Sequence, residues 1–375
     1  MPGVILCVAA NPSIDKLFEV ERVIPGAIHR PDGFVQVPGG KGLNVARAAH
    51  SLGADVHATG ILGGHAGRWL AEALAAEGVQ GTFAWIDGET RASLSVADRE
   101  SGGLTEFYER GDDIGADGWE RLQEVARSVL PGRSWMTMSG NLPPGAPDDG
   151  YARLVAMAHE SGVRAALDAR ERALAEGIDA RPDIVKVNDE EAGWLLGTTV
   201  ASLKDARIAA EALRERVGVE GAGIVTCGAE GALIAGPSGE TLHGRLYAKG
   251  PYPVGSGDAF LGGLVTALER GDPWSDAIAL ALGAAAANAE IPGAGRLDPV
   301  RAAELAAGSD LGPALASTSG PRAPTSGNGC ASSDCGCCRT RRTRSAPRSS
   351  ASAGTASPSG GRGSRGGRAR TTGSS

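Results

Sequence analysis

Short runs of β-branched and aliphatic residues alternate with Ala-, Leu- and Glu-rich stretches from Val4 to about Ala307, and this alternation constrains the fold most. The runs predict strands and the stretches between them predict helices. Consecutive strand–helix units form a mostly parallel sheet with helices on both faces. We therefore expect an α/β fold whose ligands bind at the carboxyl ends of the strands.

The predicted elements fall into a large sheet and a small one. The best-defined strands cover Val4–Ala10, Val56–Leu62, Trp135–Ser139, Val163–Asp168, Ile184–Val187 and Ile224–Cys227. Helices are predicted over Leu43–Leu52, Ala66–Ala76, Gly118–Val129, Asp149–Glu160, Glu190–Leu196 and Leu203–Arg216. Two other stretches, Leu17–Val37 and Ala92–Tyr108, contain strand patterns without helices between them. We expect these to form a small β-sheet lid that closes over a substrate, or an extension that pairs two subunits.

Charge divides the chain at about Pro313. From there onward it has ten arginines, one aspartate and no lysine, a formal charge of +9. With the whole chain at −7, residues 1–312 carry −16. An acidic body argues against nucleic acid as the main ligand, and it requires any anionic substrate to be bound by a few placed cations.

The segment 313–375 is rich in Ser, Gly, Arg, Ala, Thr and Pro and has no aromatic residue. Such a composition cannot bury enough apolar surface to form a core, so we predict a disordered tail after one domain over residues 1–312. Its Gly-Arg repeats leave RNA binding as an alternative. We favour a product of a shifted reading frame and assign the tail no function. Its Cys-Gly-Cys-Cys run lacks the His partners and spacing usual in zinc sites.

The positions of the cysteines and the hydropathy of the chain indicate the cellular compartment of the protein. Cys7 and Cys227 lie in strand-like runs, which favours buried thiols in a reducing compartment. The chain shows no basic leader, and no apolar run reaches the ~20 residues of a membrane span. We expect a soluble, cytoplasmic protein without a membrane partner.

The segment Pro253–Gly263 reads Pro-Val-Gly-Ser-Gly-Asp-Ala-Phe-Leu-Gly-Gly and carries the clearest chemistry. A turn of small residues at a helix N-terminus exposes backbone N–H groups that bind phosphate oxygens. Asp258, directly after this turn, has no basic neighbour in the sequence. The pattern suits a general base that deprotonates a hydroxyl attacking a phosphoryl group. A carboxylate that only caps the helix is the alternative.

A second glycine cluster spans Pro38–Ala48 and also opens a predicted helix. Gly39, Gly40 and Gly42 permit close approach of a ligand to the backbone, and Lys41 adds a cation where the helix dipole already favours an anion. The spacing fits neither a Walker loop nor a dinucleotide fingerprint. Taken alone, the cluster is equally consistent with a glycine-rich turn and a solvent-exposed lysine.

Together the two clusters resemble the signature pair of the ribokinase-like PfkB family of carbohydrate kinases. The set is most similar to the hexose-phosphate branch, which includes 1-phosphofructokinases and tagatose-6-phosphate kinases. This resemblance implies a three-layer αβα fold with a β-sheet lid. It extends over residues 3–310 through further matching segments at Asn11–Asp15, Thr90–Arg91, Ser139–Pro143, Lys186–Glu191 and Thr226–Gly231.

The resemblance implies roles for the residues that bind the sugar phosphate. Asp15 and Asn44 would contact sugar hydroxyls, beside the backbone of the Gly39-Gly40 turn. Lys41 and Arg91 would bind the phosphate that the substrate already carries, and Ser139 lies near the same phosphate. From the residues alone, the alternative for Asp15 is an aspartate that caps a turn.

The resemblance also implies a nucleotide site. Asn188 and Glu191 would order Mg²⁺ and its waters near the phosphates of ATP, although an Asn-x-x-Glu sequence is also a common helix cap. Thr226, Gly228 and Gly231 would border the nucleotide.

The catalytic turn completes the implied site. Gly255, Ser256 and Gly257 would present N–H groups to the transferring γ-phosphoryl group, and Asp258 would accept the hydroxyl proton.

The predicted function is Mg²⁺-dependent transfer of phosphate from ATP to a phosphorylated ketohexose, with fructose 1-phosphate converted to fructose 1,6-bisphosphate. Tagatose 6-phosphate and fructose 6-phosphate are alternative substrates, and a catalytically silent sugar-phosphate sensor is the alternative of another class. Two departures from the branch affect the lid. Gly111-Asp112-Asp113 replaces a common Gly-Pro, and His29 and Arg30 lie where relatives vary. Pairing of two subunits through the lid is also expected.

Overall fold

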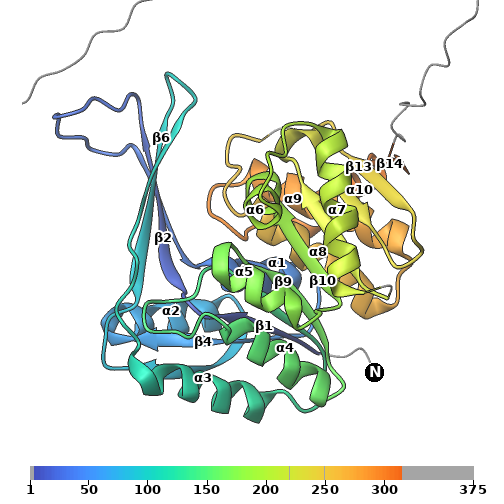
Figure 1. The fold of residues 1–375 in the computed structure, drawn as a ribbon. Helices are drawn as coiled ribbons and strands as arrows, with labels where there is room; N and C mark the ends of the chain where they lie inside the picture. Colours follow the sequence, from blue (N-terminus) through green and yellow to red (C-terminus); the bar gives the residue numbers. More distant parts are fainter. Residues whose placement is uncertain (1–3, 219, 249, 315–375) are drawn as a thin grey trace, which may run out of the picture. The chain divides into compact units, whose positions relative to one another are not determined.

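The computed structural model describes residues 4–218, 220–248 and 250–314 and shows two separate sheets (Figure 1). The chain divides into two compact units, residues 1–318 and 319–375, and the second lies outside the described residues. The predictions for the tail, including its four cysteines, therefore concern positions outside the described part of the chain.

The large sheet has ten strands in the order β14-β13-β12-β11-β10-β9-β8-β1-β4-β5. The strands from β11 to β5 run parallel, and β12 to β14 are antiparallel. The prediction of a mostly parallel sheet is confirmed. The strands are β1 (Val4–Ala9), β4 (Val56–Gly63), β5 (Gln80–Ile86), β8 (Arg133–Ser139), β9 (Arg164–Asp168), β10 (Ile184–Asn188), β11 (Ala222–Thr226), β12 (Ala232–Ala235), β13 (Thr241–Arg245) and β14 (Asp310–Pro313).

Successive side chains along a strand point to opposite sides of a sheet, so both faces of this sheet carry apolar side chains. Helices cover both faces. Leu6 and Val8 of β1 belong to one buried cluster, and Ile5 and Cys7 belong to another. The first cluster packs under α3 (Gly115–Val129), α4 (Gly150–Glu160), α5 (Glu171–Asp179), α6 (Asp189–Leu196) and α7 (Leu203–Val217). The second packs under α1 (Lys41–Ser51), α2 (Gly64–Ala76), α8 (Ser256–Arg270) and α9 (Trp274–Glu290), and α10 (Pro299–Ala307) packs on α9.

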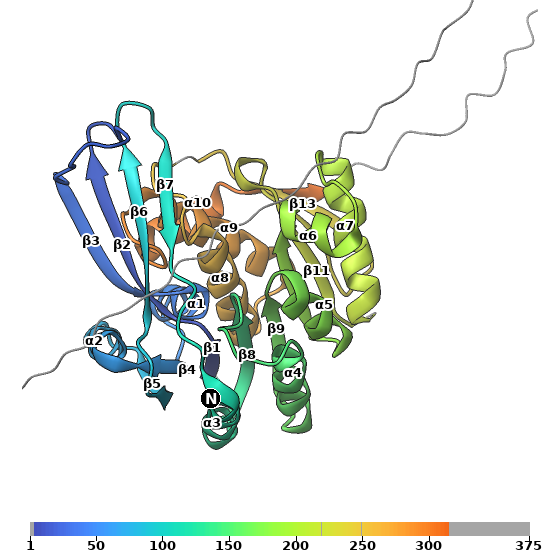
Figure 2. The same cartoon turned by 60° about the vertical axis from the view of Figure 1, so that its left-hand side comes forward.

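The small sheet is the predicted lid. Its order is β3-β2-β6-β7, and Figure 2 shows the four strands side by side, projecting from the body. The strands are β2 (Ser13–Val20), β3 (Gly33–Gly39), β6 (Arg91–Asp98) and β7 (Leu104–Tyr108). β2 follows β1 after three residues, so the lid is attached at the carboxyl end of a central body strand.

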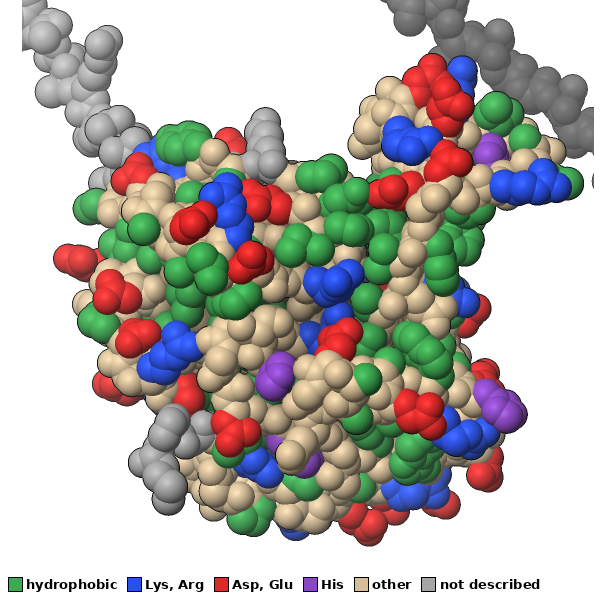
Figure 3. Space-filling view, turned by 180° about the vertical axis from the view of Figure 1, so that it is seen from behind, with side chains coloured by type: hydrophobic (Ala, Val, Ile, Leu, Met, Phe, Trp, Pro, Cys, Tyr) green, Lys and Arg blue, Asp and Glu red, His purple; other side chains and the backbone are tan. Residues whose placement is uncertain are grey.

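Within the described ranges, no helix is long and apolar enough to cross a membrane. On the face in Figure 3, acidic and basic side chains are interspersed over the body, and hydrophobic side chains gather where the lid meets it. This face shows no extended basic patch of the kind that binds nucleic acid.

Candidate active site

Four neighbouring parallel strands end in polar residues at one edge of the large sheet. Ser139 ends β8, Asp168 ends β9, Asn188 ends β10 and Thr226 ends β11. Ser139 pairs in register with Asp168, and Asn188 pairs with Thr226. The carboxyl ends of these strands, where ligands were predicted to bind, therefore form a row of polar side chains, as expected for open α/β sheets.

Asp258 lies in the first turn of α8 and is 5% exposed. The Asn44 side-chain amide donates a hydrogen bond to its Oδ2 at 2.9 Å. Burial raises the pKa of Asp258 to about 7, although Lys41 and Lys186 oppose the shift. A carboxylate with this pKa is suited to accept a proton near neutral pH. Asn44, predicted to contact the sugar, thus also holds the proposed base.

Lys41, Asp168 and Lys186 form a buried charge network beside Asp258. Asp168 is fully buried and accepts hydrogen bonds from Lys186 Nζ at 2.6 Å and from Lys41 Nζ at 2.9 Å. Burial favours the neutral acid, but the two lysines outweigh it and hold the pKa of Asp168 below its ordinary value. Lys41 also forms an ion pair with Glu191 Oε1 at 3.1 Å. The edge of the sheet therefore offers two fixed cations to an anionic ligand.

The turn that precedes Asp258 requires glycine. Gly255 has φ +84°, and a Cβ there would lie 2.7 Å from the Cβ of Ala294. A Cβ on Gly257 would lie 2.9 Å from Lys186 Nζ, so this ammonium is next to the backbone of the predicted anion hole. A phosphoryl group on the turn would have N–H donors and the Lys186 ammonium close by.

The sequence analysis did not assign a role to Asp168 or Lys186. The available signal was a lysine inside the apolar strand Ile184–Val187 and an aspartate that ends another apolar strand. Both residue types are rarely fully buried without a partner. Their positions on adjacent parallel strands explain how the two charges meet.

Asp15 and Arg91 lie together at the base of the lid. Asp15 accepts hydrogen bonds from the Ser13 hydroxyl and from the Gly40 amide, the latter at 3.2 Å. Burial raises the pKa of Asp15, and these bonds and the Arg91 charge oppose the shift. A Cβ on Gly39 would lie 2.0 Å from Asp15 Oδ2, so the predicted Gly39-Gly40 turn leaves room for this carboxylate.

The two cations that were predicted to bind one phosphate, Lys41 and Arg91, each contact other partners. Arg91 Nε donates to Asn11 Oδ1 at 3.1 Å and Arg91 Nη1 donates to the Ser93 hydroxyl at 2.9 Å, whereas Lys41 contacts Asp168 and Glu191. A shared phosphate clamp stays a prediction, and it would require Lys41 to exchange at least one carboxylate partner.

Asn188 and Glu191 form a reciprocal capping box at the start of α6. Asn188 Oδ1 accepts from the Glu191 amide at 2.7 Å, and Glu191 Oε2 accepts from the Asn188 amide at 3.0 Å. Across the described ranges, no group of three His, Cys, Asp or Glu side chains is placed to hold a metal directly. Two oxygen donors that keep free lone pairs fit Mg²⁺ bound through waters and phosphates, since this ion retains much of its hydration shell.

The remaining predicted nucleotide residues follow β11. Thr226 Oγ1 donates to the Val187 carbonyl at 3.3 Å, which ties the ends of β10 and β11 together. Gly228 has φ +54° and Gly231 has φ +92°, and a Cβ on Gly231 would lie 2.0 Å from the Gly244 carbonyl oxygen. The backbone at Gly228 is therefore open to a ligand, whereas Gly231 is needed for close packing against β13.

Two buried polar atoms of the site have no hydrogen-bond partner among the described residues: Asn44 Oδ1 and Ser139 Oγ. Both side chains are at most 3% exposed. Buried groups of this kind are normally paired, so an unpaired one at a predicted ligand edge indicates a place for a ligand or a water.

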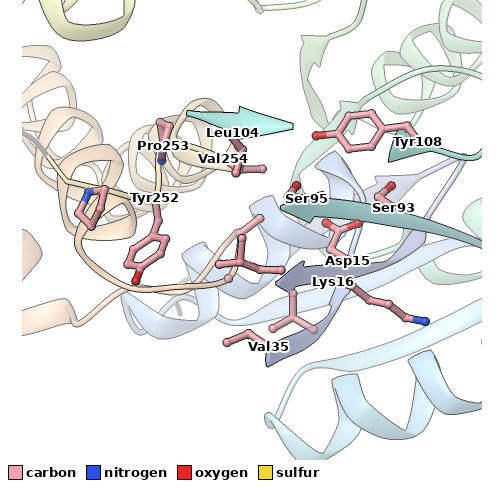
Figure 4. Close-up of a pocket in the computed structure, with 15 residues that line it drawn as sticks. Asp15, Lys16, Val35, Ser93, Ser95, Leu104, Tyr108, Tyr252, Pro253 and Val254 are labelled. Atoms are coloured by element: carbon pink, nitrogen blue, oxygen red, sulfur yellow. The ribbon is translucent and has the colours of Figure 1, made fainter. Parts of the chain in front are cut away.

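A small pocket of about 50 Å³ lies between the lid and the loop before α8. Figure 4 shows Tyr252, Pro253 and Val254 of the loop on one side and lid residues, including Asp15 and Tyr108, on the other.

The lid residues that departed from the expected branch pattern have local roles. Asp112 Oδ2 accepts from the Glu89 amide and Asp113 Oδ1 accepts from the Gly115 amide, both at 2.8 Å, so both aspartates cap turns. His29 Nε2 accepts from the Ile24 amide at 3.1 Å within the loop between β2 and β3. No bond of Arg30 is recorded among the described residues.

Comparisons with known proteins agree with this geometry. Residues 8–301 match the pfkB family carbohydrate kinase model. A 1-phosphofructokinase of Haloferax volcanii is 34% identical over 296 residues, which cover 79% of this chain and 93% of that protein.

Solved structures are similar over most of the chain. Phosphofructokinase-2 from Escherichia coli in complex with fructose-6-phosphate has a TM-score of 0.73 at 25% identity, covering 82% of this chain and 99% of that one. A possible 1-phosphofructokinase from Thermotoga maritima has a TM-score of 0.76 at 22% identity, covering 83% and 99%, and supports the fold alone.

Proposed function

Because the chain belongs to the pfkB family of carbohydrate kinases, we propose that it transfers the γ-phosphoryl group of ATP to fructose 1-phosphate and forms fructose 1,6-bisphosphate. The assignment of the reaction type rests on one observation: Asp258 is buried on a glycine turn and its pKa is raised to about 7. The choice of sugar rests on the similarity to a 1-phosphofructokinase.

In the proposed reaction, Asp258 accepts the proton of the attacking sugar hydroxyl. The hydroxyl oxygen then bonds to the γ-phosphorus, the bond from that phosphorus to the β-γ bridging oxygen breaks, and ADP leaves. The backbone N–H groups of Gly255 and Gly257 and the Lys186 ammonium stabilise the charge on the transferring group, whereas the Ser256 N–H, which was also predicted to contribute, already donates to the Pro253 carbonyl at 3.1 Å. Asn44 orients Asp258 through its hydrogen bond.

Asp15 and Arg91 are proposed to bind the sugar hydroxyls and its phosphate at the lid, with Ser139 nearby. Lys41 is proposed to leave Glu191 and turn toward an incoming phosphate, which its flexible side chain permits. Thr226, Gly228 and Gly231 would border the nucleotide. Mg²⁺, held by ATP phosphates and by Asn188 and Glu191 through waters, would neutralise charge on the β- and γ-phosphates.

The deciding experiment is a panel of fructose 1-phosphate, fructose 6-phosphate, tagatose 6-phosphate and free fructose, scored as kcat/KM from Mg²⁺-dependent ADP release. The highest value is expected for fructose 1-phosphate. A higher value for one of the 6-phosphates would replace the proposed sugar but keep the reaction. Absence of ADP release with every sugar would favour the silent sensor, which the presence of Asp258 and its glycine turn disfavours.

We also propose that two subunits pair through the lid. Phe34 and Phe107 are 58% and 61% exposed on β3 and β7, the two edge strands of this small sheet. Large exposed apolar side chains on a projecting sheet are typical of an interaction surface. The Escherichia coli phosphofructokinase-2 is described as a tetramer in one structure. Phe107→Glu is expected to lower the oligomer fraction in analytical ultracentrifugation, and an unchanged mass would contradict the pairing.

We keep two further proposals about the chain as a whole. The kinase domain, predicted over residues 1–312, is proposed to include all of β14, which ends at Pro313, and deletion of residues 315–375 is expected to leave kcat and KM unchanged. The described cysteines, Cys7 and Cys227, are unpaired thiols, in keeping with a proposed cytoplasmic location.

A further inference from the structure

A hydrogen bond joins the lid to the loop that leads into the catalytic turn. The Tyr252 hydroxyl donates to Glu19 Oε1 at 2.6 Å. Glu19 is on lid strand β2, and Tyr252 is in the loop between β13 and α8. Among the described residues, no other hydrogen bond connects the lid strands to this loop. The bond therefore spans from the lid to the body beside the pocket.

On the lid side of this contact, the neighbouring strand leaves space for the Glu19 carboxylate. Strand side chains alternate, so Glu19 is on the same face of β2 as Asp15 and Leu17, which line the pocket. Gly33 pairs with Glu19 across β2 and β3. A Cβ at Gly33 would lie 2.6 Å from Glu19 Oε2, so the glycine leaves the room that this carboxylate occupies.

The body side is stiff. Tyr252 lies between Pro251 and Pro253, which restrict the backbone on both sides. Its amide also donates to the Ala289 carbonyl at the end of α9, at 3.0 Å. Gly255, which begins the catalytic turn, follows three residues later. A displacement of the Tyr252 ring would therefore be transmitted to the turn that carries Asp258.

The ring and the hydroxyl of Tyr252 have separable roles. The ring is part of the pocket wall (Figure 4), and phenylalanine would supply the same apolar surface. The hydroxyl contributes the bond to Glu19. This bond raises the pKa of Tyr252, so the phenol keeps its proton at neutral pH and stays a donor.

We propose that Tyr252 is a positioning residue: its bond to Glu19 holds lid strand β2 at a set distance from the catalytic turn, so that a sugar on Asp15 presents its hydroxyl to Asp258. The part concerning the sugar rests on the proposed function. The part concerning the position of the lid in the enzyme without substrates does not rest on the proposed function.

Tyr252→Phe tests the bond while keeping the ring. The KM for the sugar phosphate is expected to rise about fivefold to tenfold, as for loss of one ordinary intramolecular hydrogen bond at a partly exposed site, with the KM for ATP changed less than twofold. Amide hydrogen exchange over residues 13–20 and 33–39, measured by mass spectrometry without substrates, is expected to become faster. Tyr247→Phe is the matched control, because Tyr247 is in the same loop and 84% exposed.

The partner is tested by a double-mutant cycle. Glu19→Ala is expected to raise the sugar KM as much as Tyr252→Phe does, and Glu19→Gln is expected to raise it less because its amide oxygen still accepts. The double variant is expected to have a sugar KM no higher than that of either single variant. Additive effects on the sugar KM would overturn the proposal.

The two proposals can fail independently. If no sugar of the panel is phosphorylated, faster exchange in Tyr252→Phe still supports the contact between lid and loop. If activity is normal but exchange and the sugar KM of Tyr252→Phe equal those of Tyr247→Phe, Tyr252 has no positioning role and the kinase assignment stands.

Discussion

Replacement of Asp258 by Asn is expected to abolish turnover and to stabilise the fold. Burial raises the pKa of this carboxyl from 3.8 to about 7. This shift of about three units corresponds to roughly 4 kcal/mol that the folded protein loses when the group is ionised, at 1.36 kcal/mol per unit. Asn carries no charge and still accepts the bond from Asn44, so it removes most of this cost. Turnover is expected to fall on the order of 10²–10⁴-fold, because the amide cannot act as the base.

The sign of the pH dependence separates this explanation from a general change in packing. The folded wild type keeps its proton up to about pH 7, whereas the unfolded chain loses it near pH 4. Wild-type stability attributable to this group therefore falls as pH rises from about 4 to 7 and then levels off. The stability gain of Asp258→Asn is expected to be small near pH 4, to grow toward pH 7 and to stay constant above it.

Urea unfolding between pH 4 and pH 8 measures this gain, and kcat/KM of the wild type is expected to rise with pH through about 7. Asp276→Asn is the matched control, since Asp276 lies in the first turn of α9 and is exposed. It is expected to keep full turnover and to show no such pH-dependent gain. A stability difference for Asp258→Asn that does not vary with pH, or turnover within tenfold of the wild type, would refute the reasoning.

Three further substitutions probe the glycines and the cap. Gly257→Ala brings a methyl group to about 2.9 Å from Lys186 Nζ, so this ammonium has to shift within its buried ion pair with Asp168; phosphoryl transfer is expected to slow at least about tenfold and Tm is expected to fall. Gly42→Ala places a Cβ 2.3 Å from the Val8 carbonyl oxygen, and this backbone clash is expected to lower the urea midpoint strongly. Asn188→Ala removes one side of the capping box, which costs about 1 kcal/mol in unfolding experiments, and it is expected to raise the Mg²⁺ concentration for half-maximal activity. An unchanged Mg²⁺ titration would limit Asn188 to capping.

Local pattern was sufficient for much of the fold. The six predicted body strands and six predicted helices all occur, with ends shifted by up to three residues, and the lid follows from two strand pairs without intervening helices. The antiparallel strands β12 to β14 were not predicted. They are only four or five residues long and depend on pairing with one another, which short runs near glycine turns do not reveal.

What the sequence determined by itself was the chemistry that glycine imposes locally. The glycines of the two turns, at Gly39–Gly42 and Gly255–Gly257, were sufficient to predict places where the backbone approaches an anion closely. The structure added that Gly255 has a positive φ and that Gly39 leaves room for Asp15. The tertiary structure alone decided which charges meet. Asp168 and Lys186 become partners because parallel strands place distant residues at one edge, and Tyr252 reaches Glu19 across 233 positions of sequence. No local pattern encodes such contacts, because their energy depends on burial and distance that exist only after folding.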